Sequence, residues 1–137
     1  MLLASIDRTL DELKSIDAGT AARAFEAMHR RLADGRDALA NVVQYVLDHG
    51  KRDPNAVFAG SVLYLKLAGI VLTGWQMARA LLAAQRRHAD DPAFHGAKVA
   101  TAHFFADYVL PQARALEASI LAARGDDGLF ALTDEQF

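Results

Sequence analysis

The sequence predicts an all-α protein, an up-and-down antiparallel helical bundle of three long helices plus a shorter N-terminal helix. Two observations support this fold class. Apolar residues recur in steps of three and four along most of the 137 residues, which is the spacing of one helix face. The chain also has only nine glycines and three prolines, too few for the many turns of an all-β domain. Hydrophobic residues make up 53% of the chain, enough to bury a core in one domain.

The first two helices are predicted over residues 2–16 and 21–48. An Asp-Ala-Gly-Thr segment interrupts the apolar pattern between them, and Thr20 at its end is the expected N-cap of the second helix. The apolar face of the second helix continues in phase across Asp34-Gly35, so the helix is expected to pass through this turn-like dipeptide. Gly35 then lies on the apolar face, at a place where a neighbouring helix comes close.

The two remaining helices each begin at an Asp-Pro pair. Asp53-Pro54 opens a helix predicted over residues 54–88, because aspartate is a favoured N-cap and proline fits the first helical position. Asp91-Pro92 opens the last helix in the same way.

The last helix is predicted over residues 92–124. Pro111 lies inside it and is expected to bend it, because proline removes a backbone N–H and crowds the preceding turn. Residues 1–124 thus form the predicted bundle domain, and residues 125–137 are a C-terminal tail to which we assign no structure. One apolar face of this helix consists of Phe94, Ala97, Thr101, Phe104 and Tyr108.

The third helix is apolar on nearly every side. Gly60, Gly69 and Gly74 are expected where other helices approach it closely, and Trp75 lies on one of its apolar faces. Two cations, Lys66 and Arg79, stand on the same helix. They either reach water with their long stems or pair with a carboxylate, for which Asp107 is a candidate partner of Arg79.

A further side of the third helix carries Leu63, Ile70 and Met77. The first helix is only about half as long as the others, so it leaves apolar surface uncovered, and we expect these side chains to dock on something outside the chain. The sequence leaves an alternative open, in which the bent last helix and residues 129–132 fold back over this side.

Composition and charge argue against several classes of protein. Fifteen Lys and Arg against seventeen Asp and Glu give a net charge of −2, which disfavours a nucleic-acid partner. Residues 57–82 are almost wholly apolar and long enough to cross a bilayer, but Lys66, Gln76 and Arg79 interrupt them. We therefore predict a buried core helix and no membrane span. The N-terminus lacks the pattern of a secretory signal, and a cytoplasmic location is expected.

No set of residues has the spacing of a catalytic or metal site. Glu26 and His29 form a single Glu-x-x-His motif, whereas a di-iron bundle needs two such motifs and two further glutamates. His103 and Asp107 stand four apart, which fits a surface hydrogen bond better than a metal site with too few ligands. We predict no catalytic, cofactor-binding or metal-binding residues in this chain.

Two blocks of sequence resemble a known family. The first covers residues 53–80 and includes Gly69, Gly74-Trp75 and Arg79, and the second covers residues 91–113 and includes Lys98 and Leu110-Pro111-Gln112. Together they resemble the C-terminal helical accessory domain of long bacterial acyl-CoA dehydrogenases, the group that includes the methylmercaptopropionyl-CoA dehydrogenases. The resemblance extends over residues 54–123 and more loosely over residues 21–48.

The resemblance implies a parent flavoenzyme that oxidises acyl-CoA thioesters with FAD and a glutamate base. Those elements belong to an upstream core, and no residue of this chain matches them. The resemblance gives Gly69, Gly74, Trp75, Arg79, Lys98 and Pro111 a role in packing and assembly. The expected partner is the upstream core or a second copy in a homodimer. Two other functions stay open: a stand-alone helical interaction or dimerisation module, and a small-ligand binder with an apolar cavity near Trp75 and Phe104.

Overall fold

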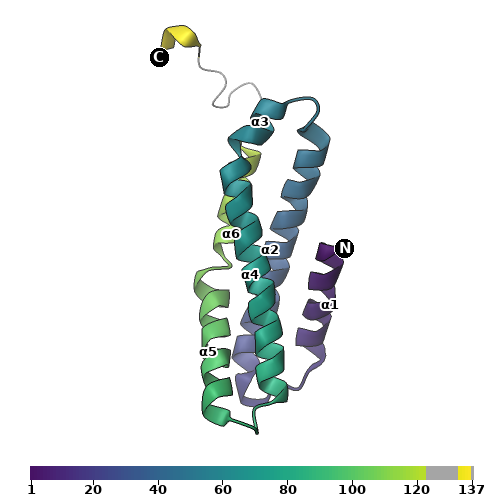
Figure 1. The fold of residues 1–137 in the computed structure, drawn as a ribbon, viewed down its shortest axis with the longest axis vertical. Coiled ribbons are helices and arrows are strands. Elements are labelled where there is room, and N and C mark those ends of the chain that lie inside the picture. The colour runs from purple at the N-terminus through teal and green to yellow at the C-terminus, as the bar shows by residue number, and fades with distance from the viewer. Residues whose placement is uncertain (123–132, 137) are drawn as a thin grey trace.

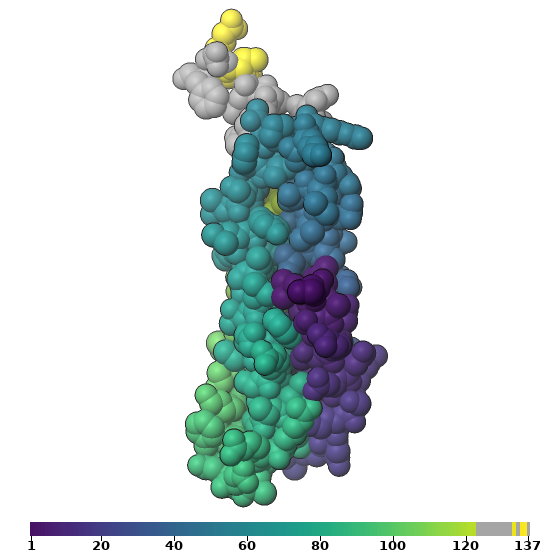
Figure 2. Space-filling view, turned by 45° about the vertical axis from the view of Figure 1, so that its right-hand side comes forward, coloured from purple at the N-terminus to yellow at the C-terminus, as the bar shows by residue number. Residues whose placement is uncertain are grey.

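The described residues of the computed structural model, 1–122 and 133–136, form an antiparallel helical bundle, as predicted (Figure 1). α2, the α3–α4 pair and the α5–α6 pair make three long antiparallel columns. α1 is shorter and packs against α2 and α4 along one half of the bundle, as Figure 2 shows from another side. The helices are α1 (Leu2–Ser15), α2 (Ala22–His49), α3 (Pro54–Ala59), α4 (Ser61–Arg86), α5 (Pro92–Tyr108) and α6 (Gln112–Leu121), with short 3₁₀ turns η1 (Gly19–Ala21) and η3 (Asp134–Gln136).

The two Asp-Pro pairs act as helix starts. The Asp53 carboxylate accepts a hydrogen bond from the backbone N–H of Ala56 at 3.1 Å, and that of Asp91 accepts one from Phe94 at 3.0 Å. The expected cap at Thr20 is wrong, because this residue lies inside η1 and α2 begins after Ala21 without a side-chain cap. Gly19 opens the turn with a φ of +50°, a conformation that favours glycine.

The helix predicted over residues 54–88 is divided at Gly60. α3 ends at Ala59, and the Gly60 N–H bonds to the carbonyl of Val57 at 3.2 Å, a tight 3₁₀-type turn. Gly60 is buried against α6: a Cβ added there would lie 3.1 Å from Ile120 Cγ2. The absence of a side chain therefore lets α6 approach the junction of α3 and α4.

The helix predicted over residues 92–124 is also two helices rather than one bent helix. α5 ends at Tyr108 and α6 begins at Gln112. The N–H groups of Val109 and Leu110 both bond to the carbonyl of Phe105, at 3.0 and 3.1 Å, so the last turn of α5 is widened before Pro111. The structure describes α6 to its end at Leu121, and the predicted domain boundary at residue 124 and most of the tail lie outside the described residues.

The core is a continuous apolar cluster contributed by all three columns and by α1. Leu110, at the α5–α6 break, is 1% exposed and fills a notch between Gly35 of α2 and Gly74 of α4. The largest fully buried side chains are Ile6, Met28, Leu32, Val42, Leu67, Val71, Leu81, Leu110 and Ile120.

Within the described part of the chain, α4 is long and apolar enough to cross a membrane by length and composition. One face of it, including Leu67, Val71 and Leu81, is fully buried in the bundle. Lys66 and Arg79 are exposed on its other sides.

Candidate interaction surface

The first apolar surface without a partner lies along α3 and the start of α4. Phe58, Val62 and Leu65 are 70, 77 and 74% exposed, and their spacing of four and three places them on one side of the column. Gly69 continues this side; it is exposed, and a Cβ added there would meet no heavy atom within 4 Å. We call Phe58, Val62 and Leu65 the α3–α4 patch.

A second exposed apolar surface lies on α5. Phe94, Phe104 and Tyr108 are 54, 59 and 69% exposed, and the rings of Phe104 and Tyr108 stack with centroids 4.8 Å apart. We call these three residues the aromatic stripe. They belong to the apolar face that the sequence indicates for this helix, yet α5 buries a different side, with Ala102 and Ala106.

The uncovered surface is thus displaced from the expected position. Leu63, Ile70 and Met77 are partly buried and pack against the core of the same chain. Of the glycines expected at close approaches, Gly60 and Gly74 face side chains of other helices, whereas Gly69 faces none among the described residues. The alternative cover from residues 129–132 lies outside the described residues.

A shallow groove of about 260 Å³ runs beside the aromatic stripe. Ala80, Ala83 and Ala84 of α4 form one wall, and α5 supplies the other. Lys98 belongs to that second wall, with its Nζ 5.2 Å from the centroid of the Phe94 ring. The groove therefore combines an apolar wall with two cationic lining residues, Arg87 and Lys98.

Trp75 links α1 to α4. Its indole N–H donates to the hydroxyl of Thr9 at 2.8 Å, and that hydroxyl donates to the carbonyl of Ser5 at 3.2 Å. The Arg79 guanidinium lies over the Trp75 ring, 5.5 Å from its centroid. The ring is half-buried at the α1–α4 contact, whereas Phe104 is exposed on α5, so the two do not share the apolar cavity considered from the sequence.

Arg79 and Asp107 do not form the ion pair considered from the sequence. The Arg79 guanidinium donates instead to the side-chain carbonyl of Gln76 at 3.1 Å. Asp107 lies 3.2 Å from Nε2 of His103, which is the surface contact expected for that i, i+4 pair.

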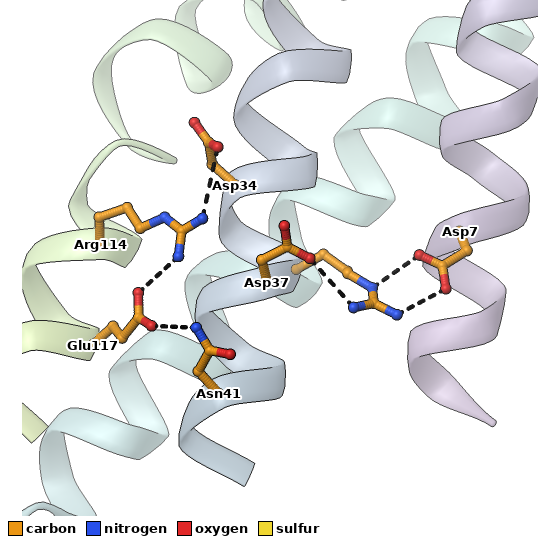
Figure 3. A network of polar contacts seen from close by, with 7 residues as sticks. Asp7, Asp34, Asp37, Asn41, Arg114 and Glu117 are labelled. Atoms are coloured by element: carbon orange, nitrogen blue, oxygen red, sulfur yellow. Dashed lines mark hydrogen bonds and ion pairs between the residues drawn. The ribbon is translucent and has the colours of Figure 1, made fainter. Parts of the chain in front are cut away.

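One side of α2 is joined to α1 by a bidentate ion pair (Figure 3). The Arg36 guanidinium donates to both carboxylate oxygens of Asp7, each at 2.9 Å, and also contacts Asp37 at 3.3 Å. The hydrogen bonds that Arg36 donates to Asp7 raise the pKa of Arg36, although partial burial acts against this. This fork holds α1 at a fixed height along α2.

The other side of α2 is joined to α6 through Glu117 (Figure 3). Its carboxylate accepts from the Asn41 amide at 2.6 Å and from the Arg114 guanidinium at 2.9 Å. Burial alone raises the pKa of Glu117, but these hydrogen bonds outweigh it and the pKa is lowered. Arg114 also reaches Asp34 at 3.8 Å. No spacing in the sequence predicts the contact between Asn41 and Glu117, because the two residues are 76 positions apart.

Among the described residues, no group of three or more His, Asp or Glu side chains is placed to hold a metal ion. Glu26 is exposed and His29 half-buried on α2. Burial, followed by the charge of Lys14, lowers the pKa of His29.

The described residues thus form an antiparallel helical bundle with two exposed apolar surfaces, the α3–α4 patch and the aromatic stripe. A family model for acetyl-CoA dehydrogenase C-terminal-like domains matches residues 2–133, and the chain belongs to this family. No solved structure matches the chain.

The chain is 40% identical over 110 residues to 3-methylmercaptopropionyl-CoA dehydrogenase from Ruegeria pomeroyi. The matched region covers 79% of this chain and 18% of that protein. The chain therefore spans less than a fifth of the length of this curated relative.

Proposed function

We propose that residues 1–124 are the C-terminal accessory domain of an FAD-dependent acyl-CoA dehydrogenase, which packs against the dehydrogenase core and stabilises its assembly without chemistry of its own. The observation that supports this role is the pair of unpartnered apolar surfaces, the α3–α4 patch and the aromatic stripe. Full burial of one such large side chain stabilises a contact by about 1.5–3 kcal/mol. A few of these residues therefore suffice to hold a domain in place.

The proposed occupant of these surfaces is the core of the same polypeptide. The relative from Ruegeria pomeroyi is a long chain in which the matched region makes up 18%. Covalent attachment gives the two parts an effective concentration in the millimolar range, so a modest patch is enough for stable packing. A second copy of this chain in a homodimer is the other candidate partner.

FAD belongs, in this proposal, to the parent enzyme and not to this domain. The cleft of about 580 Å³ between α1 and α4 is open, and charged and polar side chains such as Glu12, Arg79 and Arg86 line much of it. It offers no enclosed apolar slot for a flavin ring, so we derive no flavin step from these residues. The exposed Lys66 and Arg79 on α4 support a domain in water, in a cytoplasmic enzyme without a membrane span here.

A chimeric enzyme tests the proposal. The matching region of the Ruegeria pomeroyi enzyme is replaced by this chain, and FAD content and Tm are measured with Phe104→Ser, Tyr108→Ser and Leu65→Ser. Each variant is expected to lower the Tm of the chimera while changing the stability of the isolated chain by less than about 0.5 kcal/mol. Leu47→Ser is the matched control, because Leu47 is 69% exposed on α2 outside both surfaces.

Two results contradict this function. Equal Tm values for the three variants and for Leu47→Ser show that neither surface docks on the core. Sedimentation of the isolated chain as a dimer that the same variants dissociate assigns the surfaces to a second copy, as in a stand-alone dimerisation module.

A further inference from the structure

A polar cleft lies between α1 and α4, away from the aromatic stripe on α5. It consists of two adjoining hollows of about 580 and 300 Å³, which share Thr9, Glu12 and Arg79 as lining residues. The larger hollow adds Arg86 and the smaller adds Arg8. Figure 2 shows α1 lying along α4.

The cleft carries an excess of positive charge. Three guanidinium groups line it, against one carboxylate, that of Glu12. Arg86 donates to Glu12 at 2.7 Å, so these two charges compensate each other. Within the described part of the chain, Arg8 bonds to the hydroxyl of Ser5 and Arg79 to the amide of Gln76, and neither forms an ion pair with a carboxylate. Two positive charges thus remain uncompensated in one cleft.

Arg79 is held in place before any ligand arrives. Its guanidinium rests on the Trp75 ring, and the hydrogen bond from Trp75 to Thr9 fixes that ring against α1. A guanidinium has five N–H donors. Within the described residues, the Arg79 guanidinium uses one of them, in the hydrogen bond to the Gln76 side chain at 3.1 Å. The planar fork is therefore oriented in advance and keeps donors for an incoming oxyanion, which lowers the entropy lost on binding.

We propose that this cleft binds a phosphate-type dianion, a phosphomonoester or a pyrophosphate diester, through Arg8 and Arg79. Two uncompensated guanidinium groups match the charge of such a dianion, and their forked donors match its oxygen geometry. Two kinds of ligand could supply such a phosphate group: a free phosphate, or a nucleotide-bearing ligand such as coenzyme A. This site is independent of the docking surfaces, since none of its residues belongs to the α3–α4 patch or the aromatic stripe.

Trp75 provides the readout because it is the one tryptophan of the chain. The 137-residue chain is titrated with inorganic phosphate, pyrophosphate and coenzyme A at constant ionic strength, followed by tryptophan fluorescence and by calorimetry. Arg8→Gln and Arg79→Gln are each expected to weaken binding by about tenfold. Arg79→Lys keeps the charge without the fork and is expected to weaken it less. Arg30→Gln is the matched control. This substitution removes the same charge from Arg30, which is exposed on α2 and does not line the cleft.

Saturable binding that fails in Arg8→Gln and Arg79→Gln but persists in Arg30→Gln supports the site. Comparable affinities for phosphate and coenzyme A indicate a free phosphate, whereas binding of coenzyme A with little response to phosphate indicates a nucleotide ligand. A weak, equal response in all variants overturns the proposal as general charge screening. Binding of a polyglutamate peptide with none of the three phosphates overturns it in favour of an acidic protein partner.

Discussion

Leu110 occupies the space that a side chain at Gly74 would need. A Cβ added at Gly74 would lie 2.6 Å from Leu110 Cδ2 and 3.2 Å from Cδ1. The same Leu110 methyl would lie 3.6 Å from a Cβ at Gly35, so one side chain from the α5–α6 break holds α2 and α4 at a close distance. Since Leu110 is almost fully buried, it has little room to move aside.

Substitution of Gly74 is therefore expected to destabilise the bundle. Gly74→Leu should cost about 1–3 kcal/mol through overpacking. Gly69→Ala is the matched change on the same helix: Gly69 has open space around it, so alanine there should stabilise by about 0.5–1 kcal/mol through helix propensity. Urea unfolding of both variants, and of Gly74→Ala, measures the contrast. Equal gains for alanine at the two positions would show that Leu110 adapts without cost.

The N-caps of α3 and α5 give a second prediction. Asp91→Ala removes the acceptor for the Phe94 N–H and should cost about 1 kcal/mol. Asp91→Asn keeps an acceptor oxygen and should retain most of the stability. Thermal unfolding of the two variants, and of the same pair at Asp53, tests this. A loss as large for asparagine as for alanine would assign the effect to charge rather than to capping.

The hydrogen bond from Trp75 to Thr9 gives a third prediction. Thr9→Val keeps the shape of the side chain but removes the acceptor, so the free energy of unfolding should fall by about 1 kcal/mol and the tryptophan emission should shift to the red as α1 loosens. Thr101→Val is the control, because among the described residues the Thr101 hydroxyl bonds only to a carbonyl in its own exposed helix turn. Unchanged emission in Thr9→Val would mean that packing alone holds α1 in place.

Glu117 makes the stability of the bundle depend on pH. Its pKa in the folded chain lies below the ordinary value of 4.5. The folded state therefore stabilises the ionised form of Glu117, relative to its protonated form, more than the unfolded state does. The contribution is complete above the ordinary pKa and is lost as the pH falls through the lower, folded-state pKa. Glu117→Gln should cost about 1–2 kcal/mol at pH 7 and should flatten the decline of stability below pH 4.5.

Chemical denaturation at several pH values between neutrality and strong acid measures this effect. Asn41→Ala removes one of the two hydrogen bonds to the Glu117 carboxylate, so it should reproduce part of the flattening. A decline in Glu117→Gln as steep as in the unmodified chain would place the acid sensitivity elsewhere.

Local rules predicted the fold class and the helix starts at the two Asp-Pro pairs, but not the start of α2. The Asp-Pro signals at Asp53 and Asp91 depend on a few neighbouring residues, and the structure shows the expected caps. The breaks at Gly60 and before Gln112 were harder to predict, because the first depends on Ile120, which is distant in sequence, packing against the glycine. Periodicity continued across both breaks and predicted one continuous helix over residues 54–88 and one helix, bent at Pro111, over residues 92–124.

The exposed aromatic stripe shows a second limit of prediction from the sequence. Spacing correctly grouped Phe94, Phe104 and Tyr108 on one side of a helix, but spacing cannot tell which side another helix covers. α5 buries its alanine side, Ala102 and Ala106, since small residues allow closer packing. The position of Glu117 against Asn41 is likewise a product of helix register.

The notch filled by Leu110 also constrains how this chain can change in length. Each residue inserted into a helix turns everything after it by about 100°, so one extra residue in the 17-residue α5 would swing Leu110 out from between Gly35 and Gly74. Insertions in homologous chains should therefore collect in the connection between Arg86 and Pro92 and spare α5.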